Sequence, residues 1–176
     1  MKRAGTVVAL AALASISLAS CAPPQVDLAK GEAQRARVRS VTDGDTLRVR
    51  LAGEKDSTPV RLLGIDTPES RRPNTPVECG AKEASAALKR LALSKGRGRR
   101  VTLRSDPSQD DEDRYGRKLG YVGVRGRPDF SRAQVRAGWA KRYVYAGRPV
   151  SRDRQLRRAQ RAARRELECP RFRGHC

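Results

Sequence analysis

Two short stretches carry acidic side chains of the kind that bind divalent cations or take a proton from water. In VTDGDTLRV, residues 41–49, Asp45 follows a second aspartate and a glycine. In RLLGIDTPES, residues 61–70, an apolar run ends at Asp66 and Glu69. Carboxylate oxygens are preferred ligands of hard cations, and a positioned carboxylate serves as a general base. Both stretches therefore contain the residue types that a metal-assisted site needs.

Each stretch also has a purely structural explanation. The Asp-Gly pair at 43–44 is a strong signal for a tight hairpin turn. In the second stretch, Asp66 or Thr67 suits the N-cap of a helix. Pro68 then suits the first helical position, and Glu69 suits the first turn. Taken singly, each stretch is more typical of structure than of catalysis. The elements around the two stretches must therefore decide between these two roles.

The chain predicts a small α+β domain. Val and Leu alternate with Arg at a period near two, which is typical of half-buried strands. The strands are expected at 35–41, 46–51, 59–65, 99–105 and 117–124. Residues 80–94 place Ala84, Ala87, Leu88 and Leu91 on one helical face, and glycines follow as stop signals. A short helix is expected at 129–138, an extended piece at 139–145 and a long cationic helix at 150–167.

The N-terminal residues predict export. Lys2 and Arg3 precede an apolar, small-residue run, so residues 1–20 are expected to be a secretory signal peptide. The run ends in LASC, which resembles the lipobox of bacterial lipoproteins and implies a lipid on Cys21. The protein would then be anchored to the outer face of the bacterial cell membrane, or secreted if it is not lipidated. Residues 21–34 suit a flexible tether, and residues 35–176 are expected to form one folded domain.

The net charge of +20 at pH 7 indicates an anionic partner, either nucleic acid or a membrane surface.

The cysteines indicate a disulfide but do not decide its pairing. With Cys21 lipidated, three cysteines remain, which suggests one disulfide in an oxidising compartment. A bond between Cys79 and Cys169 is slightly favoured over one between Cys169 and Cys176. No CxxC pair occurs and His175 is the single histidine, which argues against zinc sites and histidine triads.

Several ordered segments together resemble staphylococcal-nuclease-like thermonucleases. They are DGDT, RLLGIDTPE, VECGAKEAS, DRYGRKLGYV and VRAGWAKRYVY, and the resemblance covers roughly Arg37 to Leu167. It implies a five-stranded OB-type β-barrel with about three helices, a fold that often binds single-stranded nucleic acid. We also expect the protein to be a monomer.

The resemblance assigns roles residue by residue. The two calcium-binding carboxylates fall on Asp45 and Asp66, and a main-chain carbonyl ligand falls on Thr67. Glu69 falls on the acid that acts as general base or as an electrostatic organiser. Arg61 and Arg117 fall on the arginines that bind the scissile phosphate. A neighbouring phosphate and the base or sugar would be held by Arg114, Tyr115, Tyr143 and Tyr145.

Three features depart from the family pattern. Arg114 stands where the best-known member of the family has lysine, so the positive charge is kept. Ser131 replaces a usual asparagine, and Gln134 stands where an apolar residue is common, so the packing of the short helix is in question. The acidic run 110–113 lacks the spacing of a calcium loop and is expected to be a solvated loop.

The resemblance therefore implies a hydrolase, a calcium-dependent endonuclease that cleaves DNA and RNA without sugar specificity and leaves 3′-phosphate products. The alternative from another class is a noncatalytic OB module that binds nucleic acid at the cell surface. A basic envelope lipoprotein with a structural role would explain the charge and the anchor, but it would leave the ordered motifs to coincidence.

Overall fold

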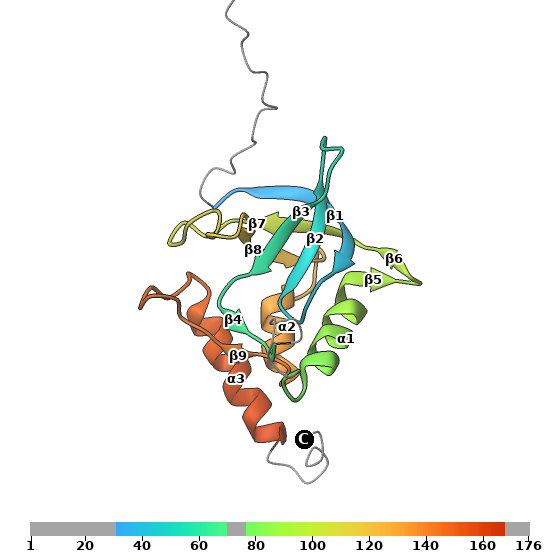
Figure 1. Cartoon of the computed structure of the whole chain (residues 1–176). Helices are drawn as coiled ribbons and strands as arrows, with labels where there is room; N and C mark the ends of the chain where they lie inside the picture. The colour runs from blue at the N-terminus through green and yellow to red at the C-terminus, as the bar shows by residue number, and fades with distance from the viewer. Residues whose placement is uncertain (1–30, 70–76, 168–176) are drawn as a thin grey trace, which may run out of the picture.

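Five strands close into a barrel in the computed structural model (Figure 1). The structure describes residues 31–69 and 77–167. The order around the barrel is β1-β2-β3-β8-β7; β3 and β8 are parallel and the other neighbours antiparallel. This closed five-stranded arrangement confirms the predicted OB-type α+β fold. The strands are β1 (Ala33–Val41), β2 (Thr46–Leu51), β3 (Thr58–Leu62), β7 (Arg100–Arg104) and β8 (Lys118–Gly123).

The alternation in the sequence becomes the inside and outside of the barrel. Val38, Leu47, Val49 and Leu103 are at most 1% exposed and fill the interior. The arginines between them point outward, because successive side chains of a strand face opposite sides. Strand β1 starts at Ala33, inside the range 21–34 that the sequence assigns to a tether.

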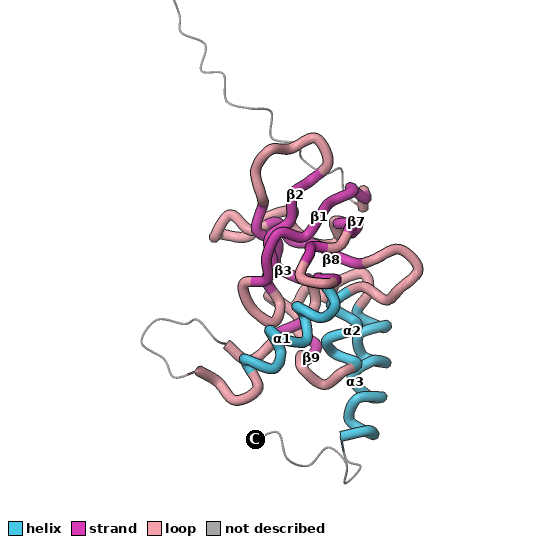
Figure 2. Tube along the Cα trace, turned by 90° about the vertical axis from the view of Figure 1, so that its right-hand side faces the viewer, coloured by secondary structure: helices cyan, strands magenta, loops and turns pink. Residues whose placement is uncertain are grey.

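Three helices gather at one end of the barrel (Figure 2). They are α1 (Ala81–Ala92), α2 (Phe130–Arg136) and α3 (Asp153–Leu167). Helix α1 buries Ala84, Ala87 and Leu88, as its apolar spacing predicts. Its first turn carries an acid and its last turn carries two bases, which complements the helix dipole.

Two short ribbons depart from the predicted elements. The strand expected at 59–65 breaks after Leu62, and Gly64 has a φ of +74° in the turn that follows. A side chain at Gly64 would lie 2.5 Å from Leu156 of α3, so the position needs glycine for space as well as for conformation. The chain then continues as β4 (Ile65–Asp66), which pairs with β9 (Lys141–Arg142). Residues 93–98 form the second ribbon, β5 (Leu93–Ser94) with β6 (Arg97–Gly98).

Several predictions fall on residues that the structure does not describe. They are the signal peptide and lipidated cysteine, Cys21, and the disulfide partners Cys169 and Cys176. Cys79 is disulfide-bonded. Its pairing with Cys169 stays a prediction, because Cys169 lies outside the described residues. Within residues 31–69 and 77–167, no helix is long and apolar enough to cross a bilayer.

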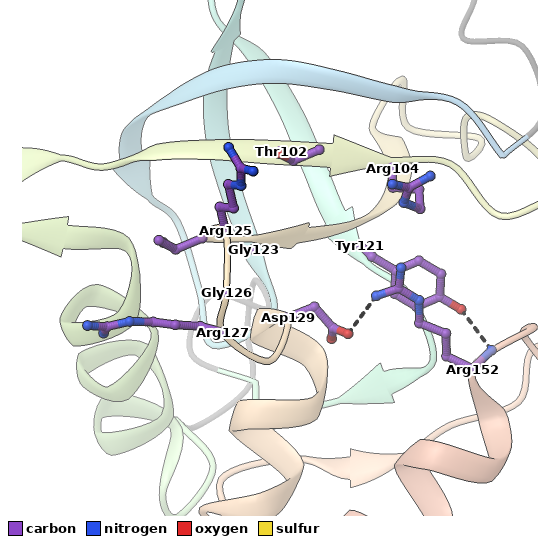
Figure 3. A pocket seen from close by; sticks show the side chains of 10 residues that line it. Thr102, Arg104, Tyr121, Gly123, Arg125, Gly126, Arg127, Asp129 and Arg152 are labelled. Atoms are coloured by element: carbon purple, nitrogen blue, oxygen red, sulfur yellow. Dashed lines mark hydrogen bonds and ion pairs between the residues drawn. The ribbon is translucent and has the colours of Figure 1, made fainter.

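A buried carboxylate attaches the start of α3 to the barrel. Asp106, 1% exposed, accepts hydrogen bonds from Tyr121 Oη at 2.5 Å and from the amide and hydroxyl of Ser151, each at 2.8 Å. Next to it, Arg152 stacks on the Tyr121 ring at 4.2 Å and binds Asp129 at 2.8 Å. Figure 3 shows Tyr121, Asp129 and Arg152 among the residues that line a hollow of about 210 Å³ over β7 and β8. The helix is therefore tied down by polar bonds as well as by its apolar face.

Replacement of Asp106 by asparagine should lower stability in a pH-dependent way. Burial alone would raise the pKa of this carboxyl, but the hydrogen bonds from Tyr121, Ser108 and Ser151 outweigh it and lower the pKa from 3.8 to about 2. The charged form therefore stabilises the fold above pH 4, by about 2 kcal/mol. That stabilisation is lost as the pH falls through 3.8 towards 2, because the unfolded state takes up a proton in this range before the folded state does.

Urea unfolding at several pH values tests this. The Asp106→Asn variant should be about 2 kcal/mol less stable than wild type at pH 7, and the difference should shrink at pH 2 to 3. Asp56→Asn makes the same change at an exposed carboxyl of the β2–β3 loop and should have little effect. A pH-independent difference would show that the charge of Asp106 is not what holds α3.

Candidate active site

The turn between β1 and β2 places Asp45 below the surface. The amides of Thr42 and Asp43 both donate to the carbonyl of Thr46, at 2.9 and 3.0 Å, which closes the turn. Gly44 sits at its tip against α1, where an added Cβ would lie 2.8 Å from both Ala84 Cβ and Thr67 Oγ1. Only glycine fits this approach, which presses the turn onto its neighbours and leaves Asp45 7% exposed.

Three hydrogen bonds and one guanidinium surround the Asp45 carboxylate. Its Oδ2 accepts from the Thr67 amide at 3.3 Å and from Thr67 Oγ1 at 3.0 Å. The same oxygen lies 2.5 Å from Arg61 Nη1. Its Oδ1 accepts from Thr46 Oγ1 at 3.0 Å. Thr46 of the same turn, together with Arg61 and Thr67 of the stretch 61–70, therefore fixes the orientation of this carboxylate.

Asp66 approaches the same arginine from the other side. Its Oδ1 lies 3.5 Å from Arg61 Nη2, and its Oδ2 lies 3.4 Å from Lys141 Nζ. The lysine is there because β4 pairs with β9 in a register that sets Asp66 opposite Lys141. Two carboxylates thus share one guanidinium, with a second cation at the edge of the site.

Arg117 enters from the loop before β8 and is held by Asp113. Its Nε and Nη2 lie 2.8 and 2.7 Å from Asp113 Oδ2, and its Nη1 lies 3.4 Å from Thr46 Oγ1. Burial alone would raise the pKa of the Asp113 carboxyl, but hydrogen bonds from Arg117 and Tyr115 hold it below its ordinary value. Asp113 is therefore charged at neutral pH and orients Arg117, although the sequence placed it in a solvated acidic loop.

Glu69 lines the same cleft. Its amide donates to Glu78 Oε2 at 3.1 Å, and the Glu78 amide donates back to the Glu69 carbonyl at 3.0 Å. These bonds join the two ends of the chain segment between residues 69 and 78. All six residues that the resemblance assigns to metal and phosphate line one cleft of about 610 Å³: Asp45, Arg61, Asp66, Thr67, Glu69 and Arg117.

The four residues assigned to the rest of the nucleic acid are not part of that lining. Tyr115, Tyr143 and Tyr145 are 66%, 43% and 61% exposed. Arg114 donates to Tyr115 Oη at 2.6 Å, and the Arg117 guanidinium lies 5.4 Å from the same ring. The exposed ring of Tyr115 is therefore joined to the cleft through Arg117.

The donor set fits a hard divalent cation in its chemistry. Asp45 and Asp66 supply two carboxylates on one cleft, and Thr67, to which the resemblance assigns a main-chain carbonyl ligand, lines the same cleft. Calcium takes several oxygen ligands and keeps water in its shell, so it does not require a third carboxylate. Among the described residues, no three His, Cys, Asp or Glu side chains form a metal cluster. Protein cations balance both carboxylates, through Arg61 and Lys141.

Gln134 is a positioning residue that the sequence marked only as a departure from a family pattern. It is fully buried on α2, and its Nε2 donates to the Gly44 carbonyl at 2.7 Å and to the Ala84 carbonyl at 2.9 Å. It therefore ties the turn that carries Asp45 to α1. An apolar side chain would fill the space without these two bonds.

The fold and the cleft define an OB-type barrel with paired carboxylates and arginines at one end. Comparison with known families then places the chain. The family described as "Staphylococcal nuclease homologue" matches residues 59–168, well over half of the sequence. The protein belongs to this family.

Curated relatives agree with that placement. A protein named thermonuclease from Staphylococcus hyicus is 36% identical over 118 residues, which cover 67% of this chain and 64% of that protein. The thermonuclease of Staphylococcus intermedius is 37% identical over 108 residues, covering 61% and 59%. Endonuclease YncB of Bacillus subtilis is 38% identical over 104 residues, covering 58% and 46%. The chain thus spans less than two thirds of the length of these relatives.

Replacement of Gln134 by leucine should loosen the turn that holds Asp45. The Gly44 and Ala84 carbonyls would each lose a buried donor, at a cost of about 2 kcal/mol in the free energy of unfolding. Hydrogen exchange should show faster exchange of the amides of residues 42–46 than in wild type. Gln155→Leu changes an exposed glutamine of α3 in the same way and should leave both measurements unchanged. If Gln134→Leu matched this control, the two carbonyl contacts would not hold the turn.

Proposed function

We propose that this protein is a calcium-dependent nuclease that hydrolyses phosphodiester bonds of DNA and RNA. The observation that carries the proposal is the pair of carboxylates, Asp45 and Asp66, with Arg61 between them and Arg117 facing the same cleft. Paired acids alone would suit a cation, and paired arginines alone would suit an anion. Their combination suits a phosphate bound beside a metal ion.

The two arginines would bind the scissile phosphate. A guanidinium presents parallel N–H donors that match two phosphate oxygens. Arg117 is oriented by Asp113, whereas Arg61 is held by the two carboxylates. Asp45, Asp66 and the Thr67 carbonyl would hold the calcium ion. The bound ion would stabilise the negative charge that builds up on the phosphoryl oxygens, and it would take over the neutralisation that Arg61 supplies to the carboxylates.

Glu69 would take a proton from the attacking water. The water oxygen would form a bond to phosphorus while the bond from phosphorus to the 5′ oxygen breaks. The leaving 5′ oxygen would take up a proton from solvent, which leaves a 3′-phosphate and a 5′-hydroxyl. The two arginines face the phosphate on which charge increases during this step, so their stabilisation is greatest in the transition state. The hydrogen bonds between Glu69 and Glu78 fix the main chain that carries the base.

The exposed tyrosines would bind the nucleotide beside the cleft. Aromatic faces stack on any base, and arginines contact any phosphate, so such a surface requires no particular sugar. Arg114 and Tyr115 stand next to Arg117 and suit this role, as do Tyr143 and Tyr145 on the chain after β9. This supports action on both DNA and RNA, with single strands as the more accessible form.

Calcium-dependent degradation of single-stranded DNA is the direct consequence. Full-length protein should shorten a labelled 30-nucleotide strand in the presence of Ca²⁺, and excess chelator should stop the reaction. A noncatalytic OB module would retard the strand in a gel without shortening it. Intact DNA after prolonged incubation with Ca²⁺ would therefore favour the binding module over the enzyme.

The matched variant for this assay is Glu69→Gln. It keeps the size of the side chain but removes the proton acceptor, so turnover should fall by about a hundredfold or more. Retardation of the strand in chelator should remain close to wild type. Unchanged turnover would remove Glu69 from the mechanism while leaving the arginine cleft in place.

We also propose that the enzyme works outside the cytoplasm, held to the membrane through lipid on Cys21. The signal-like run and the LASC segment support this, and several acyl chains would make the attachment stable. Intact mass spectrometry of membrane-extracted protein should show loss of residues 1–20 and added acyl mass. Cys21→Ser should abolish the added mass. A wild-type protein that lacks acyl mass and is found in the medium would instead be secreted.

A further inference from the structure

Helix α3 carries a row of arginines on its exposed side. Arg154, Arg158, Arg161 and Arg165 are all exposed and are spaced by four, three and four residues. This spacing places neighbouring side chains on one helical face, about 5 to 6 Å apart. The row, which we call the arginine row, is about 16 Å long. Together with Ala162 the four side chains line a shallow hollow of about 460 Å³.

The acids at the ends of α3 do not neutralise this row. Asp153 binds Arg142 and Arg157, and Glu166 binds Arg136 of α2. Within residues 31–69 and 77–167, no ion pair joins an acid to any member of the arginine row. Like charges at these spacings repel one another and destabilise a helix. Repulsion within the arginine row therefore lowers the stability of the free protein, and an anionic partner would remove that repulsion.

The opposite face of the helix is already used. Leu156, Ala159 and Ala163 are buried, and α3 packs against α2. A helix that lies in a lipid interface needs a free apolar face to insert, and this one is covered by the protein. The exposed face offers guanidinium groups in a line, which suits a linear series of phosphates better than a lipid surface.

The helix is also coupled to the candidate active site. In β9, Lys141 lines the cleft beside Asp66, while the Arg142 side chain binds Asp153. The Arg142 amide also donates to Gln160 Oε1 of α3 at 2.6 Å. Figure 1 shows β9 between the helix and the barrel end where β4 lies. The two residues of β9 therefore join the cleft to α3.

We propose that the arginine row is a second phosphate-binding surface, which holds the backbone of a nucleic-acid strand beyond the segment bound in the cleft. The inference rests on the proposed nuclease function, because it extends the substrate of that site. The row would contact phosphates through charge and bidentate hydrogen bonds and would not discriminate between bases. Its expected contribution is to affinity for long strands, not to the chemical step.

Salt dependence of binding measures this contribution. A labelled 30-nucleotide single strand is titrated with full-length protein in chelator at 50 to 200 mM salt. The variant changes all four residues of the row to glutamine. Loss of four phosphate contacts should reduce the slope of log K against log salt by about 3. The affinity advantage of wild type should accordingly shrink about 50-fold over this salt range.

A matched control removes the same charge elsewhere. Arg35, Arg39, Arg50 and Arg97 are exposed on strands of the barrel and the β5–β6 ribbon, and they change to glutamine together. This control should keep most of the wild-type slope. Changing the arginine row to lysine should also keep most of it, which separates loss of charge from damage to the helix. An equal loss of slope in the control and the row variant would overturn the proposal, since only net charge would then matter.

Two further readouts separate the remaining outcomes. Anionic and zwitterionic vesicles test lipid binding; a row variant that binds DNA like wild type but loses anionic vesicles would overturn the proposal in favour of a membrane surface. Cleavage of the same strand in Ca²⁺ tests the enzyme separately. Because binding is measured in chelator, absence of cleavage would remove the proposed nuclease function without changing the salt-slope result.

Discussion

The candidate site depends on one arrangement of charges, an arginine held between two carboxylates. Arg61 lies in β3 between the buried Val60 and Leu62, and it contacts Asp45 on one side and Asp66 on the other. The buried Asp45 carboxylate would be costly without a positive partner. The barrel supplies the geometry, because the Leu62 amide donates to the Asp45 carbonyl at 2.8 Å and so sets β3 against the turn. The break after Leu62 then returns Asp66 to the same arginine.

Contacts from the neighbouring turn, ribbon and helices fix the positions of Asp45, Asp66 and Arg61. Gly44 allows the turn to press on α1 and Thr67, and Gln134 ties the carbonyl of that glycine to α1. The short ribbon of β4 and β9 brings Lys141 to Asp66 and, through Arg142, connects the site to α3. The helices therefore do more than cover the end of the barrel. They carry the second layer of contacts that orients the carboxylates.

The sequence was informative where one local pattern decides the outcome. Alternating Val and Arg predict the barrel strands, and the spacing of Ala84 and Leu88 predicts α1. Ordered motifs also predicted that Asp45 and Glu69 would belong to one site, and the structure brings them to one cleft. Contacts between distant segments were not predictable. Gln134 acquires its meaning only from carbonyls that lie 50 and 90 residues away in sequence. The contact between Asp113 and Arg117 is a different case, since the two residues are only four apart in sequence. It was missed because the acidic run 110–113 looked like a solvated loop.

The central claim is that Asp45 and Asp66 form a calcium site inside an arginine-lined cleft. Calorimetric titration of Ca²⁺ into the protein, without nucleic acid, tests it most directly. The account predicts one binding event, weakened at least about tenfold by Asp45→Asn and unaffected by Asp56→Asn on the exposed β2–β3 loop. Absence of binding by the wild-type protein, or equal binding by Asp45→Asn, would contradict it.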